Sequence, residues 1–353
     1  MVHVGIDLHQ KSSYLYALDD QTGELLLNEE VPSDRQALLD CLVPCCQGRG
    51  EVRLVLEACG FAGFWSDVLD PLGEVVAVHP KHVKGFQGKD KKKNDRRDAQ
   101  FLVDLSRINR LPRAYLGRTS ERDLKDLLRY RVGLVRIQTR LRVRLRNVAQ
   151  RYGTPLAASD VDSAKARQLW VQWPLRDTHR LIVEQLLEVL AEVGNRVAAV
   201  EEQIAKQAVK NRTVELLDTL PGVGLFGALL IAAEIGDWKR FSSGEALACF
   251  AGLVPSEESS GGRTQRGRIT KEGSSYLRWI MVQAALHADQ SPRLNHLYAR
   301  VRERRGAMKA RVAVAREMLV IAWQMLRTGR PYEERPPQPS GKGSGQLASS
   351  LTH

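Results

Sequence analysis

Long apolar runs and paired cysteines are both missing from this chain of 353 residues. No apolar segment approaches the length of a membrane span, and the N-terminus lacks the basic-then-apolar order of a signal peptide. The odd number of cysteines and the lack of paired CxxC motifs argue against a disulfide framework and against zinc: Cys41, Cys45, Cys46, Cys59 and Cys249. We therefore expect a soluble protein of a reducing compartment, with no membrane partner.

Acidic residues are too few to balance the basic ones, and the net charge of +12 is unevenly spread. Eight Lys or Arg accompany three Asp between Lys81 and Asp98, and twelve accompany three acids between Arg113 and Arg151. The apolar residues of the second stretch have helical spacing and predict a buried stripe: Leu134, Ile137, Leu141, Leu145 and Val148.

Three arginines run along another face of this predicted helix, namely Arg136, Arg140 and Arg144. Such a ridge suits phosphate backbones through bidentate contacts and counterion release, without implying sequence specificity. A solvated surface helix is the alternative, but solvated helices usually mix charges of both signs. The pattern therefore favours a nucleic-acid partner.

Four carboxylates stand where a metal-dependent nucleic-acid enzyme needs them. Asp7 and Glu57 each end a strand-like run, and Asp95 and Asp98 share one face of a predicted helix because they are three residues apart. Four converging carboxylates repel one another unless cations neutralise them, and hard oxygen ligands suit Mg²⁺. The pattern predicts a two-metal phosphodiester site. Helix capping or a solvated face remains the alternative for each acid taken alone.

The order of elements indicates an α/β fold for the first part of the chain. Turn signals separate three strands, after which helices and strands alternate. The predicted elements are strands at Val2–Leu8, Ser12–Leu18 and Glu24–Glu30, a helix from Ser33, a strand at Val52–Glu57, a helix near Phe61–Leu69, a strand at Val75–His79 and a helix from about Asp95. With acids on the first strand, the fourth strand and a late helix, this order resembles the RNase H-like (RuvC-like) fold.

The middle of the chain predicts a coiled segment. Seven apolar residues alternate three and four apart, which is a heptad seam of about three repeats: Val183, Leu186, Leu190, Val193, Val197, Val200 and Ile204. An amphipathic helix of a bundle is the alternative. A seam could pair protomers or fold back on the preceding helix.

A phosphate-binding turn and a candidate nucleophile follow. Pro221-Gly222-Val223-Gly224 looks like a helix-hairpin-helix element, whose backbone N–H groups can hold a phosphate, although a plain tight turn competes. Ser259-Ser260-Gly261-Gly262 reads as a flexible polar loop on composition alone. A serine beside glycines and several cations nonetheless suits phosphoryl transfer, and the cations are Arg263, Arg266, Arg268 and Lys271.

Together these blocks resemble the DEDD transposases of the insertion sequence 110 family, also known as bridge-RNA-guided recombinases. The resemblance covers about residues 2–305 and is carried by several motifs: Gly5-Ile6-Asp7, Glu57-Ala58, Asn94-Asp95-x-x-Asp98-Ala99, Gly252-Leu253-x-Pro255, Ser260-Gly261, Ile269-Thr270-Lys271-x-Gly273 and Tyr276-Leu277-Arg278.

The resemblance implies a metal-binding tetrad of Asp7, Glu57, Asp95 and Asp98, and Ser260 as the serine that becomes covalently linked to DNA. Many members have Gln-Ser-Gly here, so Ser259 is a rival nucleophile. The family further implies donor and target DNA, a noncoding bridge RNA that pairs with both, and dimers and tetramers whose active sites combine the RuvC-like domain of one subunit with the serine domain of another. It implies a cytoplasmic, nucleoid-associated protein of bacteria or archaea.

We accordingly expect a RuvC-like catalytic domain with the basic helix at 1–155, a helical or coiled-coil segment at 156–212, a mostly helical domain with the serine at 213–328 and a disordered Pro- and Gly/Ser-rich tail at 329–353. A RuvC-like nuclease that uses water, such as a junction resolvase, and a non-enzymatic binding protein are the other classes. Detection of a covalent protein–DNA adduct separates the recombinase from the nuclease, and metal-dependent cleavage excludes the binding protein.

Overall fold

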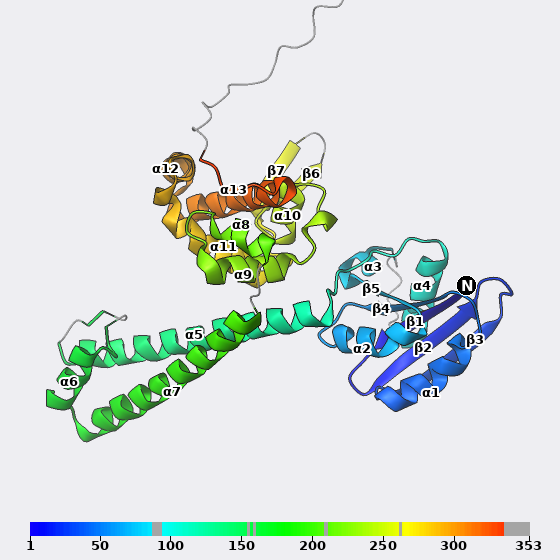
Figure 1. The fold of residues 1–353 in the computed structure, drawn as a ribbon, viewed down its shortest axis with the longest axis horizontal. Helices are drawn as coiled ribbons and strands as arrows, with labels where there is room; N and C mark the ends of the chain where they lie inside the picture. Colours follow the sequence, from blue (N-terminus) through cyan, green and yellow to red (C-terminus); the bar gives the residue numbers. More distant parts are fainter. Residues whose placement is uncertain (87–93, 154–155, 158–159, 208–210, 261–262, 335–353) are drawn as a thin grey trace, which may run out of the picture. The chain divides into compact units, whose positions relative to one another are not determined.

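A computed structural model describes residues 1–86, 94–153, 156–157, 160–207, 211–260 and 263–334 (Figure 1). It divides into two compact units, Met1–Arg122 and Asp123–His353. Most of the basic helix therefore lies in the second unit, whereas the sequence grouped it with the first domain. No helix of the described ranges is long and apolar enough to cross a membrane.

The first unit is built on a five-stranded mixed sheet in the order β3-β2-β1-β4-β5. Strands β1, β2 and β3 are antiparallel neighbours, whereas β1, β4 and β5 run parallel. Their bounds are β1 Val2–Leu8, β2 Ser12–Asp19, β3 Leu25–Pro32, β4 Val52–Glu57 and β5 Glu74–Val78. All seven residues of β1 are buried because helices cover the central strand on both faces.

Helices α1 (Arg35–Cys46) and α2 (Ala62–Leu69) bury their apolar residues against one face of this sheet. Helix α4 (Asp95–Arg107) covers the other face, where Ala99 and Val103 pack with Tyr16 of β2. The short helix α3 (Pro80–Phe86) contributes Val83 to the same side. A mixed sheet with helices on both faces is compatible with an RNase H-like domain.

The second unit begins with a helical hairpin. The long helices α5 (Thr119–Arg151) and α7 (Asp177–Gln207) lie side by side (Figure 1), and α6 (Ala164–Gln172) packs at their far end. Val193 and Val197 of the predicted seam pack on Leu134 of α5. The seam therefore folds back on the preceding helix, which is one of the two outcomes that the heptads allowed.

The rest of this unit is mostly helical around one large core. Its helices are α8 Arg212–Asp218, α9 Gly224–Ile235, α10 Gly244–Phe250, α11 Ser275–Ala284, α12 Pro292–Arg305 and α13 Ala307–Thr328. It also contains two short 3-10 helices, η2 (Trp238–Arg240) and η3 (Ala285–Gln290). A third, η1 (Asp70–Leu72), belongs to the first unit. A two-stranded antiparallel sheet, β6 (Pro255–Ser260) and β7 (Arg263–Ile269), lies between α10 and α11 in the chain.

Three expectations need correction. Ile137 is 41% exposed and does not belong to the buried stripe of α5, because Val132, Leu134, Leu145 and Val148 face the partner helix and core instead. Ser259 and Ser260 lie in strand β6 rather than in a loop, while Gly261 and Gly262 lie outside the described residues.

The third correction concerns the start of the tail, which the sequence assigned to disorder from residue 329. Tyr332 donates its backbone N–H to the Thr219 hydroxyl at 2.9 Å, and its own hydroxyl lies 2.9 Å from that of Ser291. These bonds fix the chain as far as Glu334, which accepts from the backbone of Arg293. Residues 335–353 of the predicted tail lie outside the described residues.

Candidate active site

Two strands bring the first pair of acids together. Because β1 and β4 are parallel and Ile6 is paired with Leu56, Asp7 and Glu57 leave the sheet next to each other at the same edge. Asp7 is buried and Glu57 is half-buried. The carboxyl edge of parallel strands thus carries both carboxylates.

Helix α4 supplies the second pair from above the sheet. Its N-cap is Asn94, whose side chain accepts a hydrogen bond from the backbone of Arg96 at 3.0 Å, so Asp95 and Asp98 both fall in the first helical turn. The helix lies directly on β1 at Gly5, where a Cβ would overlap the carbonyl oxygen of Ala99. This close approach of α4 to β1 determines how far Asp95 and Asp98 lie from Asp7.

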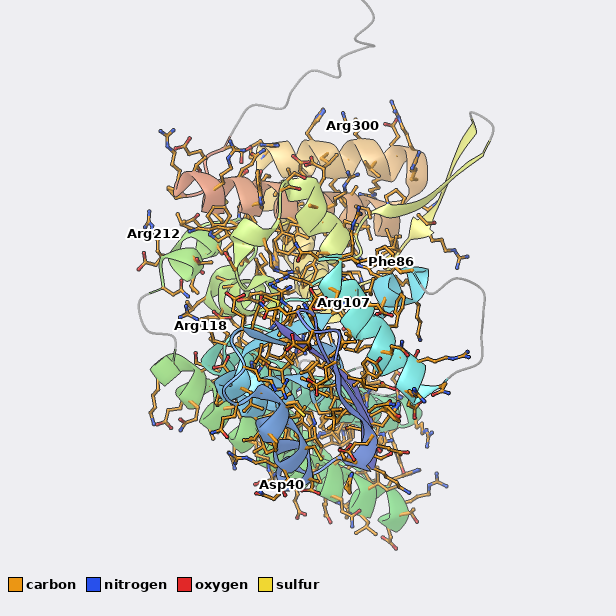
Figure 2. All side chains as sticks on the ribbon, turned by 90° about the vertical axis from the view of Figure 1, so that its right-hand side faces the viewer. Asp40, Phe86, Arg107, Arg118, Arg212 and Arg300 are labelled. Carbon is orange, nitrogen blue, oxygen red and sulfur yellow. The ribbon has the colours of Figure 1, made fainter. Side chains whose placement is uncertain are left out.

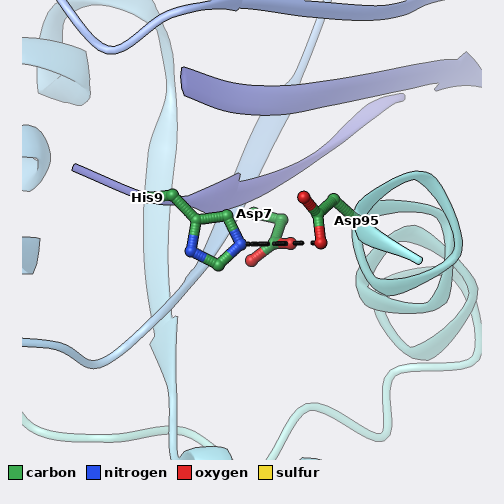
Figure 3. Close-up of side chains that lie close together, drawn as sticks. All are labelled: Asp7, His9 and Asp95. Carbon is green, nitrogen blue, oxygen red and sulfur yellow. Dashed lines mark ion pairs between the residues drawn. The ribbon is translucent and has the colours of Figure 1, made fainter. Parts of the chain in front are cut away.

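A histidine joins the acids at the centre of this site (Figure 3). The Nε2 atom of His9 lies 3.2 Å from Oδ2 of Asp7 and 3.7 Å from Oδ1 of Asp95. Ligand atoms of Asp7, His9 and Asp95 all lie within 4.8 Å of one another, as in a group that can hold a metal ion. The backbone of His9 is fixed by Ser33, whose hydroxyl donates to the His9 carbonyl at 2.7 Å.

Burial and neighbouring charges both act on the carboxylates of the site. Burial raises the pKa of Asp7, and the charges of Asp95 and Asp98 raise it further while His9 lowers it. Burial likewise raises the pKa of Glu57, with Asp7 and Asp98 adding to the rise and Lys84 opposing it. Asp7 is thus influenced by Asp95 and Asp98, and Glu57 by Asp7 and Asp98, although Glu57 and Asp98 lie outside the close group of Asp7, His9 and Asp95.

The residues present fit a divalent cation. Oδ2 of Asp7 and Nε2 of His9 are buried atoms that make no well-directed hydrogen bond with any described residue. An unsatisfied buried carboxylate oxygen among further acids is what a hard cation such as Mg²⁺ neutralises. His9 was not among the sequence-predicted residues. Its position two residues after Asp7 was the available signal, but only the fold turns its ring back onto Asp7.

The candidate serine lies in the second unit, at the end of a hairpin strand. Ser259 is paired with Thr264, and Ser260 with Arg263, so both serines fall in the last two positions of β6. The side chains of residues 257–266, including those of Ser260, Arg263 and Arg266, lie outside the described residues. The exposed side chains of Arg268 and Lys271 follow at the base of the hairpin.

Two glycines tie the base of this hairpin to the helical core. Gly252 and Gly273 have φ values of 66° and 77°, and a Cβ on either would overlap backbone atoms, of Glu272 and Phe250 respectively. Lys271, between them, has a positive φ of 55°, which is uncommon for a residue with a side chain. The Gly-Leu-x-Pro and Thr-Lys-x-Gly motifs are therefore two halves of one interlocked turn.

A buried carboxylate connects this turn to α5. Glu234 of α9 is 3% exposed and accepts two hydrogen bonds from Arg129, at 2.6 and 2.9 Å. It also accepts from the Ser274 hydroxyl at 2.8 Å, and Ser274 caps α11 immediately after Gly273. The pairing raises the pKa of Arg129. The basic helix and the base of the serine hairpin thus share one ion pair, of which the carboxylate is buried.

The predicted arginine ridge divides into two kinds of residue. The Arg136 guanidinium lies over the rings of Tyr276 and Trp279, at 5.3 and 5.5 Å from their centroids. Arg140 and Arg144 are exposed and have no partner among the described residues. Only the latter two are therefore available to an external phosphate without loss of an internal contact.

The predicted Pro-Gly-x-Gly element lies between α8 and α9, as expected. Gly222 and Gly224 have φ values of 75° and 61°, which suit glycine. The turn borders an open cleft of about 510 Å³ that His287 and Gln290 also line. The cleft leaves room for a ligand beside the turn.

Comparison with known proteins gives consistent matches over both units. A family model described as a transposase, DEDD_Tnp_IS110, matches residues 4–154, and a model described as "Transposase IS116/IS110/IS902 family" matches residues 214–299. The transposase for insertion sequence element IS1111A of Coxiella burnetii is 30% identical over 295 residues, which cover 79% of each chain. A probable family 20 transposase of Pseudomonas aeruginosa is 24% identical over 92% of this chain and 96% of its own.

Proposed function

Because this chain belongs to the IS116/IS110/IS902 family of transposases, we propose that it cleaves and rejoins the DNA of an insertion sequence through a covalent phosphoserine. The observation that carries this proposal is that Asp95 of α4 meets Asp7 at the end of β1, with Glu57 next to Asp7 at the end of β4 and Asp98 in the same helical turn as Asp95. Such a group is costly for a merely structural role, because burial and neighbouring charges oppose the ionisation of Asp7 and Glu57.

Mg²⁺ is the cation that we assign to the four acids. When bound, it supplies charge neutralisation for the scissile phosphate and lowers the pKa of an attacking hydroxyl. The protein's part is to hold the carboxylates in place through β1, β4 and the capped start of α4. His9 lies between two of these carboxylates, with its Nε2 atom 3.2 Å from Asp7 and 3.7 Å from Asp95.

We assign Ser260 as the nucleophile. Its Oγ would form a bond to phosphorus while the bond from phosphorus to the sugar oxygen breaks; the serine proton passes to a base, and the leaving oxygen takes up a proton. Attack by a hydroxyl of another strand reverses this step, releases the serine and conserves the phosphodiester energy, so no ATP is needed. Ser259, its neighbour on the strand, remains the rival residue.

The partners that we propose are donor and target DNA, a bridge RNA that pairs with both, and further copies of this chain as dimers and tetramers. The unpaired Arg140 and Arg144 on α5, and the exposed Arg268 and Lys271 beside the hairpin, support contacts with phosphates. We assign the same role to Arg263 and Arg266, as the sequence predicts, whereas the Arg136 guanidinium of the predicted ridge already lies over Tyr276 and Trp279.

A metal-dependent nuclease is the competing function, because the four acids lie together within one compact unit and carboxylate-bound metal suffices for attack by water. The distinguishing experiment uses the full chain, the RNA transcribed beside its gene, and duplex DNA that spans the ends of the element. Joined product that forms with Mg²⁺ and not with EDTA, and that changes its target when the pairing segment of the RNA is changed, supports the proposal. Breaks without joined product in every condition would favour the nuclease.

A further inference from the structure

A strongly basic surface lies where α12 meets α13. Between residues 300 and 316 there are seven Lys or Arg and one Glu, a net charge of +6. Figure 2 shows Arg300 among side chains that project outward from α12. We call these seven residues the α12–α13 basic surface: Arg300, Arg302, Arg304, Arg305, Lys309, Arg311 and Arg316.

Intramolecular ion pairs do not neutralise this surface. Among the described residues none of the seven pairs with an acid, and only Arg311 makes a polar contact, 3.9 Å from the sulfur of Met308. Other exposed cations of the same unit do have such partners. Three of them pair with an acid three or four residues away: Arg196 with Glu192, Lys206 with Glu202 and Arg212 with Glu215.

Helix stabilisation does not explain the surface either. Arg302, Arg304 and Arg305 lie in the last turn of α12, where cations gain about 0.3–1 kcal/mol each from the helix dipole. Lys309, however, lies at the start of α13, where the dipole disfavours a cation. That helix has no acid in its first turn and no side-chain cap at Gly306. Stabilisation of the two helices therefore does not account for all the positive charge at this junction.

The shape and composition of the surface indicate its partner. His296, Arg300 and Arg304 are four residues apart and form a ridge about 12 Å long at 1.5 Å per residue. Each strand of duplex DNA presents a phosphate about every 3.4 Å along its axis, so the ridge faces three or four phosphates. Met308 is the one exposed large apolar residue within this surface, so among the described residues the surface offers no exposed Phe, Tyr or Trp ring on which single-stranded bases could stack.

We propose that the α12–α13 basic surface binds the phosphate backbone of double-stranded DNA, independently of base sequence. This goes beyond the proposed chemistry, because binding here requires neither the acids nor the serine. It also lies on a different element from the arginines of α5, so the two surfaces contribute separately to affinity.

The test compares two triple variants of the full chain, each of which removes three positive charges. Arg300→Gln/Arg304→Gln/Arg305→Gln changes the surface, and Arg196→Gln/Lys206→Gln/Arg212→Gln removes cations that already have acidic partners. Binding to a duplex DNA of arbitrary sequence is measured by fluorescence anisotropy over a range of KCl concentrations in EDTA, which prevents cleavage.

For the surface variant we expect affinity to fall about tenfold or more, and the slope of log K against log salt to lose about 0.9 for each phosphate contact removed. The control variant should change much less. Arg300→Gln/Lys309→Gln, which leaves the last turn of α12 intact, should show the same effect in part with an unchanged melting temperature.

A parallel titration with an RNA hairpin separates the two nucleic acids. Loss of DNA affinity beyond that of the control supports the proposal, whether or not RNA binding also weakens. Equal losses in the surface and control variants would overturn it, and so would a loss confined to the RNA hairpin. Because EDTA is present throughout, failure here leaves the proposed chemistry untouched.

Discussion

Gly5 of β1 and Ala99 of α4 touch backbone to backbone, so closely that a Cβ on Gly5 would overlap the Ala99 carbonyl oxygen. The contact falls two residues before Asp7 on the strand and one residue after Asp98 on the helix. It therefore couples the packing of α4 on the sheet to the distance between the two pairs of acids.

Gly5→Ala should displace α4 and separate Asp95 and Asp98 from Asp7. We expect a loss of about 1–3 kcal/mol in the free energy of unfolding, as for other overpacked sites, together with a loss of Mg²⁺-dependent cleavage. Gly85→Ala is the matched control, since a Cβ there meets nothing within 4 Å and its helical backbone suits alanine. Normal stability and cleavage in Gly5→Ala would show that α4 need not lie so close.

The raised pKa values of Asp7 and Glu57 predict how metal-free stability varies with pH. The ordinary pKa values of these two carboxyls are 3.8 and 4.5, and both are raised in the folded protein, which therefore binds their protons more tightly than the unfolded chain does. The protonated carboxyls contribute their full stability at pH values below the ordinary pKa. That contribution is lost as the pH rises through the raised pKa values. In EDTA near pH 7, Asp7→Asn should therefore raise the melting temperature.

Saturating Mg²⁺ should reverse that order, because the cation stabilises the wild type and has one ligand fewer in Asp7→Asn. Asp104→Asn serves as the control: burial also raises the pKa of Asp104, but its pKa is not coupled to the four acids. It should keep the wild-type response to Mg²⁺. A melting temperature that Mg²⁺ leaves unchanged in the wild type would contradict the metal assignment.

The two kinds of arginine on α5 should respond differently to substitution. Arg140→Ala/Arg144→Ala should weaken nucleic-acid binding and lower its salt slope by about 0.9 per lost contact, with little change in melting temperature. Arg136→Ala should instead lower stability by about 0.5–1 kcal/mol, because it removes the guanidinium from Tyr276 and Trp279. Salt titrations and thermal melts of the two variants decide this, and a reversed pattern would refute the division of the ridge.

Removal of the Glu234 charge should be costly. Glu234→Gln removes the bidentate partner of Arg129, whose side chain is 36% exposed, and we expect a loss of about 1–3 kcal/mol in stability. Glu192→Gln, which breaks the exposed pair with Arg196, should cost less than about 0.5 kcal/mol. Chemical denaturation of both variants measures the difference. Similar losses of stability for the two variants would mean that the pair of Arg129 and Glu234 does not hold α5 against α9.

Much of the first unit could be predicted from local sequence patterns. β1 and β4 have the predicted bounds, Val2–Leu8 and Val52–Glu57, because continuous apolar runs mark strands covered on both faces. α4 begins at Asp95 as predicted, since Asn94 is a strong N-cap. The order and direction of the strands then follow the predicted α/β arrangement.

What the sequence could not predict depends on tertiary contacts. His9 enters the site because Ser33 holds its backbone, and Ile137 is exposed because its neighbours on α5 face the core. The hairpin of Ser259 and Ser260 was missed because their polar composition resembles a loop, although a Gly-Gly pair between two runs is also a hairpin signal. The metal and nucleophile roles of these residues stay predictions.

The most direct test of the account is to trap the reaction on DNA and look for a covalent protein–DNA adduct. Wild type with Mg²⁺ should give a denaturant-resistant adduct whose peptide maps to Ser260, while Ser260→Ala binds DNA normally and gives none. Ser256→Ala, on the same strand, is the control and should behave as wild type. An adduct at Ser259 would move the nucleophile by one residue. Cleavage by Ser260→Ala, with no adduct in the wild type, would contradict the account and identify water as the nucleophile.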